Sequence, residues 1–326
     1  MKIAFVGKGG SGKTTLASLF ARHAAASGAQ VLALDADINQ HLAAALGMPE
    51  PAPLSAHLPL IKEYLRGANP RIASAASMIK TTPPGAGSRL VRPDEDNPIY
   101  RACVRSAGGV RLAVAGPFTE EDLGVACYHS KVGAVELLLN HMVDGPGEYV
   151  VVDMTAGADS FASGLFTRFD VTFLVCEPTL RSVGVYRQYR EYAKDYDVRI
   201  AVIGNKVENA EDLAFLREHV GGHLLASLGR SRFVRAMERG DVRPIGELEP
   251  DNAGALAAMR DLVDVVPKDW AKFQRQAVEF HLRNARAWGN DRTGVDLADQ
   301  VDPDFLLDLR LGHGAAVGEH GGVLQP

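Results

Sequence analysis

Cysteine is scarce in this chain, which has three cysteines in 326 residues, Cys103, Cys127 and Cys176. Three scattered cysteines do not make a disulfide framework, so we expect a reducing, cytoplasmic environment. Long apolar runs are also missing, and the first apolar segment ends at Gly7, too early for a signal peptide. The net charge of −5 argues against a surface built throughout to hold nucleic-acid phosphates. The sequence therefore gives no strong signal for a nucleic-acid or membrane partner.

The composition that is present is typical of a soluble globular protein. Hydrophobic residues make up 46% of the chain and charged residues 23%. This length accommodates one large α/β domain or two smaller ones. No internal repeat is visible.

The stretch GKGGSGKTT, residues 7–15, is a phosphate-binding loop by its spacing G-x-x-x-x-G-K-[ST]. It follows the apolar run KIAFV and precedes an alanine-rich segment with helical spacing, which is the strand, loop and helix context that the motif requires. In such loops the lysine, here Lys13, reaches the β and γ phosphates, and the next hydroxyl, Thr14, coordinates magnesium. An ordinary glycine turn would leave the Lys-Thr pair unexplained. The predicted nucleotide contacts are Gly7, Gly9, Gly10, Ser11, Gly12, Lys13, Thr14 and Thr15.

Alternation of apolar runs with helical segments predicts a doubly wound, mostly parallel α/β sheet with ligands at the carboxyl ends of its strands. We expect seven strands, at 2–6, 30–37, 109–116, 148–157, 170–178, 198–207 and 223–228. The expected helices cover 16–26, 39–46, 131–142, 183–196, 210–219 and 252–266.

The predicted ATPase domain comprises residues 1–266. Clustered prolines and glycines between about 50 and 109 indicate a loose insertion with one helix near Leu60–Arg66 and little else. Residues 267–326 form a C-terminal extension, with a helix at Lys268–Trp288 followed by a weakly ordered tail. The aromatic side chains of that helix are expected to pack on the core. They are Trp270, Phe273, Phe280 and Trp288.

Polar residues end several of the predicted strands, in the order that a nucleoside triphosphatase needs. Asp153 ends one strand as a magnesium-side carboxylate does, and Asp35 is assigned to the same ion. Asp37 or Asp35 would orient an attacking water or accept its proton. Asn205 is placed to offer its amide to a base edge. The remaining predicted nucleotide contacts are Gly157, Glu177, Pro178 and Lys206.

These motifs resemble the deviant phosphate-loop ATPases of the ParA, MinD, ArsA and nitrogenase iron protein class. The resemblance rests on the extra lysine of the loop, Lys8, together with DADINQ and DMTAG. It implies a homodimer that binds ATP and Mg²⁺, in which Lys8 crosses to the partner's nucleotide. It also implies that Asp37 activates water and that Asp153 holds magnesium through water. A solvated loop lysine is the alternative for Lys8.

Within that class, residues 1 to about 240 resemble the CooC-type ATPases that mature nickel-containing carbon monoxide dehydrogenase. Those ATPases carry Cys-x-Cys in a loop where two subunits pool four thiolates around a metal. This chain has Cys127-Tyr128-His129 instead. Cys127 and His129 from two subunits would give a Cys2His2 site for Zn²⁺ or Ni²⁺ at the dimer interface. A partly buried cysteine beside a helix-capping histidine is the alternative.

The leading hypothesis is therefore a homodimeric ATPase that assists metal insertion into a client metalloenzyme. The alternative is a positioning ATPase like ParA or MinD, whose ATP-bound dimer binds DNA, membrane or a protein partner. An electron donor like the nitrogenase iron protein would need a second cysteine near DMTAGADSF, and this segment has none.

Overall fold

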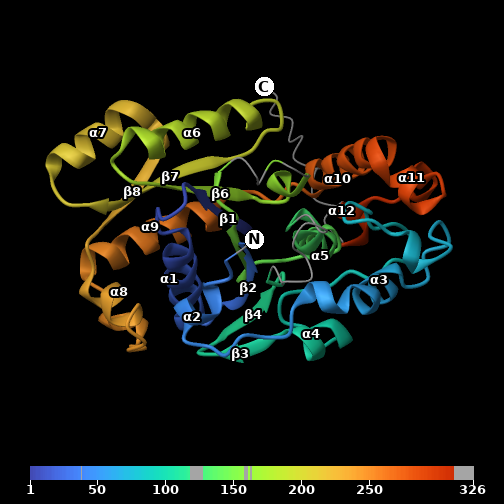
Figure 1. Ribbon diagram of the computed structural model, residues 1–326, viewed down its shortest axis with the longest axis horizontal. Coiled ribbons are helices and arrows are strands. Elements are labelled where there is room, and N and C mark those ends of the chain that lie inside the picture. Colours follow the sequence, from blue (N-terminus) through green and yellow to red (C-terminus); the bar gives the residue numbers. More distant parts are fainter. Residues whose placement is uncertain (38, 118–127, 158–160, 162–163, 312–326) are drawn as a thin grey trace, which may run out of the picture.

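The computed structural model describes residues 1–37, 39–117, 128–157, 161 and 164–311, with the backbone alone at 128–130. The chain folds around one eight-stranded sheet in the order β3-β4-β2-β5-β1-β6-β7-β8 (Figure 1). Neighbouring strands are parallel except for β3 and β4. The predicted doubly wound α/β fold is confirmed. The strands are β1 (Lys2–Gly7), β2 (Gln30–Ala36), β3 (Arg105–Ala107), β4 (Val110–Val114), β5 (Glu148–Met154), β6 (Val171–Cys176), β7 (Ile200–Val207) and β8 (Leu224–Gly229).

The sequence predicted seven of these eight strands. The strand that it missed is β3, which lies inside the insertion. It pairs antiparallel with β4, with Arg105 opposite Leu112, and all three of its residues are exposed. Gly108 and Gly109 join the two strands, and both have positive φ, as a tight turn requires. Such a short polar strand has no hydrophobic period to reveal it.

The insertion is also more regular than the single predicted helix. That helix is present as α3 (Leu58–Arg66), and a second one, α4 (Pro98–Cys103), follows. The side chain of Asn97 caps α4 by accepting a hydrogen bond of 2.9 Å from the backbone N–H of Tyr100. A helix of this length carries too few apolar positions to show a period.

Helices cover both faces of the sheet, because alternate residues of the buried strands point to opposite faces. One face packs against α1 (Lys13–Ala26), α2 (Leu42–Leu46), α8 (Arg232–Met237) and α9 (Pro250–Val265). The other packs against α3, α4, α5 (Tyr128–Asn140), α6 (Leu180–Ala193) and α7 (Ala210–Val220). Both layers are visible in Figure 1. The loops at the carboxyl ends of the strands therefore form one edge where ligands can gather.

The C-terminal segment packs on this domain. Helix α10 (Trp270–Asn284) continues through a π-helical turn (Ala285–Gly289) into α11 (Asn290–Thr293), and α12 (Leu307–Arg310) follows. Trp270 and Phe273 are buried with Leu307, as expected for an aromatic stripe on the core. Where the sequence predicts weak order after Trp288, the structure describes the chain as far as residue 311 and buries Leu297, Phe305 and Leu307. Residues 312–326 lie outside the described part.

Candidate functional site

The predicted phosphate loop connects β1 to α1, which begins at Lys13. Two of its glycines are required by the backbone. Gly7 has φ +151°, and a Cβ there would lie 2.5 Å from the carbonyl oxygen of Val175. Gly12 has φ +97°, and a Cβ there would lie 2.2 Å from Nδ2 of Asn205. Any side chain at either position would move the loop, so the loop is held in the conformation that presents its amides.

Thr14 and Asp153 meet beneath the loop. The Thr14 hydroxyl donates a hydrogen bond of 2.5 Å to Oδ2 of Asp153, which is fully buried on β5. The other oxygen, Oδ1, is buried with no hydrogen-bond partner in the described part of the chain. Burial, reinforced by the charge of Asp35, raises the pKa of Asp153 well above its ordinary value. A hydroxyl beside a carboxylate with an unused buried oxygen is a donor set that fits Mg²⁺, directly or through water.

Asp35 and Asp37 differ in what they contact. Asp35 is fully buried, and its two oxygens accept hydrogen bonds from the backbone N–H groups of Asp37 at 3.1 Å and Leu42 at 2.9 Å. Burial raises the pKa of Asp35 to about 6 despite these bonds. The carboxylate thus holds the start of α2 in place, and its predicted magnesium role stays a prediction.

Asp37 faces the phosphate loop. Its Oδ2 lies 3.9 Å from Nζ of Lys13, which is 5% exposed, and its Oδ1 accepts a 3.0 Å hydrogen bond from the backbone of Asn39. Asp37 also lines the cavity over the loop, which Asp35 does not. Of the two aspartates proposed for water activation, Asp37 is the one whose carboxylate is available to a molecule bound there.

A carboxylate between two lysines forms the outer rim of the loop. Glu177, after β6, accepts from Lys206 Nζ at 2.6 Å and from Lys8 Nζ at 3.4 Å. Lys206 also donates to the Gly10 carbonyl at 2.7 Å, and Lys8 to the Gly9 carbonyl at 2.9 Å. Burial alone would raise the pKa of Glu177, but the two ammonium groups hold it below its ordinary value. The lysines are thereby placed on the outside of the loop, away from Lys13.

Asn205, near the carboxyl end of β7, holds the loop through its side chain. Its side-chain amide donates a 2.7 Å hydrogen bond to the carbonyl oxygen of Ser11, so in this structure it supports the loop. It also lines the cavity, as its predicted contact with a base requires. Gly157 has φ +72°, consistent with the predicted turn after β5, and Pro178 is half-buried after Glu177.

A cavity of about 770 Å³ opens above the loop. Its volume suits a ligand of nucleotide size. One wall, which the sequence did not reveal, is the start of α8, where Arg230 and Ser231 face the cavity. The available signal was a helix cap: the Ser231 hydroxyl accepts a 2.9 Å hydrogen bond from the backbone N–H of Val234.

The predicted Cys127–His129 metal site lies outside the residues whose side chains the structure describes. Cys176, in the apolar strand β6, and Cys103, in the insertion, are both buried free cysteines. Over the described ranges, no group of three or more His, Cys, Asp or Glu side chains is arranged to hold a metal ion. None of the helices described is both long and apolar enough to span a membrane.

Comparison with known proteins agrees with this geometry. The model of the CobQ/CobB/MinD/ParA nucleotide-binding domain matches residues 3–243. The carbon monoxide dehydrogenase accessory protein CooC of Rhodospirillum rubrum is 32% identical over 264 residues, which cover 79% of this chain and 95% of that protein. An ATP-binding protein of Methanocaldococcus jannaschii is 32% identical over 220 residues, covering 67% of this chain and 79% of its own.

Solved structures share the fold. The septum site-determining protein MinD of Pyrococcus horikoshii, complexed with Mg-ADP, matches with a TM-score of 0.55 at 17% identity, covering 81% of this chain and 96% of that one. A ParA family ATPase of Chlorobium tepidum matches with a TM-score of 0.52 at 17% identity, covering 85% and 96%. The chain therefore belongs to the CobQ/CobB/MinD/ParA family of nucleotide-binding proteins.

Proposed function

We propose that this protein is an ATP-hydrolysing homodimer that assists the maturation of a metalloenzyme. The main support for a dimer is that two lysines lie on opposite sides of one loop. The Lys13 side chain lies inside, 6% exposed, whereas the Lys8 side chain is 33% exposed on the rim. One lysine is thus available to the nucleotide of its own subunit and the other to a second subunit. The similarity to the CooC accessory protein supports the maturation role.

Hydrolysis follows from the groups around the loop. The loop amides and Lys13 bind the phosphates, and Asp37 orients a water for attack on the γ phosphorus, from which ADP departs as the leaving group. Thr14 and Asp153 would hold Mg²⁺, which when bound neutralises phosphate charge. Lys8 from the second subunit adds positive charge beside the negative charge that the phosphate oxygens carry in the transition state.

The proposal that the protein carries a metal ion is based on the sequence alone. Cys127 and His129 supply one thiolate and one imidazole per chain, and two chains supply the four ligands that Zn²⁺ or Ni²⁺ accepts. A client metalloenzyme would receive the metal when hydrolysis reopens the dimer.

Lys8→Ala tests the shared site. We expect the variant to bind a fluorescent ATP analogue as a monomer but to lose both ATP-dependent dimerisation, measured by light scattering after gel filtration, and turnover. Lys194→Ala is the control, because Lys194 is exposed and pairs only with Glu191 among the described residues. Turnover that survives in Lys8→Ala would contradict the dimer assignment.

The cargo has its own test. Equilibrium dialysis against Ni²⁺ or Zn²⁺ should give one ion per ATP-bound dimer, lost in Cys127→Ser and in His129→Ala but kept in His223→Ala, an exposed histidine of η6 (Gly221–His223). No bound metal at micromolar concentration would overturn the maturation role. ATP-dependent pelleting with vesicles, or a shift of nonspecific DNA, would instead assign the positioning function.

A further inference from the structure

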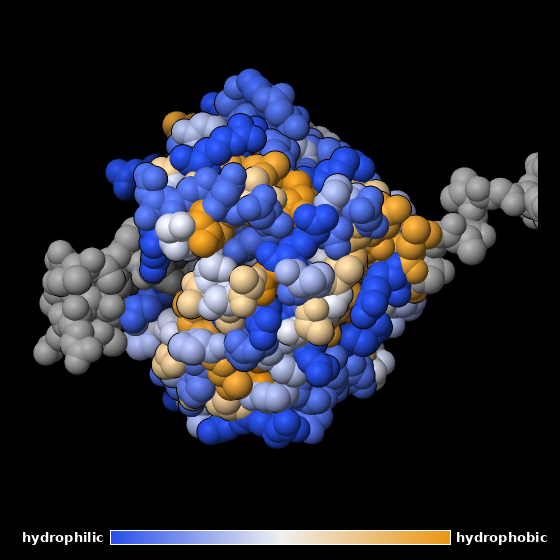
Figure 2. Space-filling view, turned by 90° about the vertical axis from the view of Figure 1, so that its right-hand side faces the viewer, coloured by the Kyte–Doolittle hydropathy of each residue, from blue (hydrophilic) through white to orange (hydrophobic). Residues whose placement is uncertain are grey.

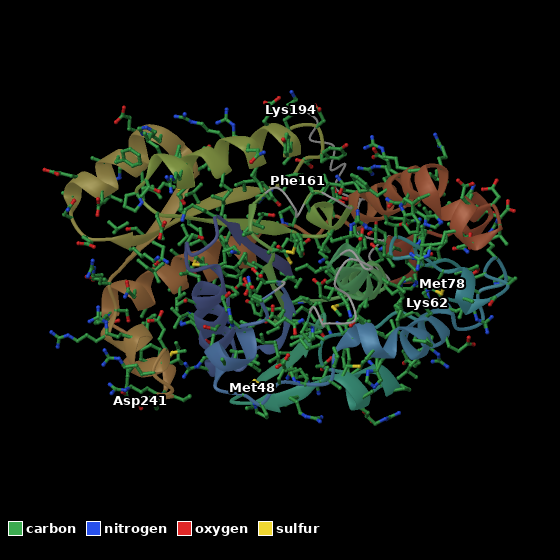
Figure 3. All side chains as sticks on the ribbon, viewed as in Figure 1. Met48, Lys62, Met78, Phe161, Lys194 and Asp241 are labelled. Atoms are coloured by element: carbon green, nitrogen blue, oxygen red, sulfur yellow. The ribbon has the colours of Figure 1, made fainter. Side chains whose placement is uncertain are left out.

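A second cavity, of about 560 Å³, lies where the insertion meets the C-terminal segment. Its lining comes from α3, residues 74–80 and residues 288–295, together with Gly133 of α5. Figure 3 places Lys62 and Met78 close together at this end of the molecule, far along its long axis from α1 and α8. The cavity is therefore separate from the nucleotide site.

The lining is mainly apolar. Leu58, Met78, Ile79 and the ring of Trp288 contribute to it from segments far apart in the sequence. Met78 and Ile79 are buried, whereas Trp288 is half-buried. Figure 2, which faces this end of the molecule, shows apolar surface interrupted by hydrophilic side chains. An apolar interior with a few polar groups is the usual character of a small-molecule site.

Two cations in this cavity are close enough to repel each other. Lys62 of α3 and Arg292 of α11 both line it, and no carboxylate of the described residues forms an ion pair with either. Burial and the charge of Arg292 lower the pKa of Lys62. A third cation, Lys80, is by contrast 4.0 Å from the carboxylate of Glu136.

The chain is acidic overall, with a net charge of −5, so carboxylates are plentiful. Even so, Lys62 and Arg292 lie together beside an apolar wall without a carboxylate partner among the described residues. An anion placed between them would remove their repulsion and gain two charge-assisted hydrogen bonds. Arg292 also lies 5.8 Å from the ring centroid of Trp288, which places positive charge next to the apolar surface.

We propose that this cavity binds a small organic anion with an apolar body, its carboxylate or sulfonate between Lys62 and Arg292 and its body against Met78 and Trp288. The volume suits such a ligand. Because the ligand would contact the insertion and the C-terminal segment together, it would join the two parts. The site is independent of the nucleotide pocket and of the function proposed for it.

The test uses 8-anilinonaphthalene-1-sulfonate, an aromatic anion that fluoresces in apolar surroundings, with the full-length chain. We expect one dye molecule to bind per chain. The double variant Lys62→Gln/Arg292→Gln should bind the dye at least about tenfold more weakly, because each lost charge removes a charged hydrogen bond. The matched control is Arg283→Gln/Arg286→Gln, which removes two exposed arginines that do not line the cavity. Circular dichroism should show both variants folded.

Competition identifies the ligand class. Octanoate should displace the dye, whereas octanol and inorganic phosphate should do so at least tenfold less effectively, since each lacks one half of the ligand. Saturating Mg-ATP should leave the dye bound. Equal affinity in the Lys62→Gln/Arg292→Gln variant, displacement by ATP, equal competition by octanol, or no dye binding would each overturn the proposal.

Discussion

Asp144→Asn tests how firmly the C-terminal segment is tied to the sheet. Asp144, before β5, is buried and accepts hydrogen bonds from Lys268 Nζ at 2.7 Å, and its Oδ1 lies 3.0 Å from Lys2 Nζ. Lys2 begins β1 with its side chain fully buried, and its ammonium lies 4.4 Å from the ring centroid of Trp270 on α10. One carboxylate thus links the first strand to the helix that opens the extension.

The size of the effect follows from this burial. The side chain of Asp144 is 1% exposed and that of Lys2 is 0% exposed, so an amide at position 144 leaves a buried ammonium without its counter-charge. Burial already lowers the pKa of Lys2 to about 8 in the intact protein. Breaking a buried ion pair costs about 3 to 5 kcal/mol. At about 2.1 cal/mol/K per residue, this loss lowers the melting temperature of a 326-residue chain by roughly 4 to 7 °C.

Differential scanning calorimetry and urea unfolding measure this loss. The matched control is Asp96→Asn, because Asp96 also forms an ion pair at 2.7 Å, with Arg101, but both side chains of that pair are more than half exposed. An exposed pair contributes little, so the control should stay close to the unmodified protein. If Asp144→Asn and Asp96→Asn melt within a degree or so of one another, the reasoning about the buried carboxylate is refuted.

Two further predictions concern the phosphate loop and acid stability. Gly12→Ala should weaken nucleotide binding at least about tenfold, because its Cβ would meet the Asn205 amide, whereas Gly28→Ala, at φ +84° with nothing within 4 Å, should not; equal nucleotide affinities would count against the clash. Burial lowers the pKa of His281, hydrogen-bonded to the Leu297 carbonyl, to about 4. Its neutral form therefore contributes stability above pH 6.5 that is lost as pH falls towards 4, about 3 kcal/mol in all. Urea unfolding at pH 7, 5.5 and 4 should show a shallower decline in His281→Gln, and an unchanged decline would contradict the assignment.

The place of the candidate nucleotide site in the fold follows from the sequence because its residues lie at the ends of strands. The defined spacing of the loop at Gly7–Lys13 predicts phosphate contacts, and parallel strands bring their carboxyl ends to one edge. The spacing of residues in the sequence does not show which hydrogen-bond or ion-pair partner each polar group has. Asp35 and Asp37 are two residues apart, yet one binds backbone amides and the other faces Lys13.

The rest of the fold had weaker signals. The helix α8 that walls the nucleotide cavity is six residues long, too short for a period, and its place beside the loop depends on tertiary packing. The pairing of Glu177 with Lys8 and Lys206 joins residues far apart in the chain, which a single sequence does not reveal. The sequence of residues 289–311 predicts weak order because their apolar residues, such as Leu297 and Phe305, are spaced without a period.

The short strand β3 bears on how two copies can associate. A sheet grows between molecules when an edge strand offers a long, flat row of free backbone groups. At the β4 side this sheet ends instead in three exposed residues that begin with Arg105, and the turn at Gly108 and Gly109 leads directly back into β4. Such an edge offers a second copy little to pair with. The association that we propose, through the loops at the strand ends where Lys8 lies, would therefore meet little competition from sheet extension at this edge.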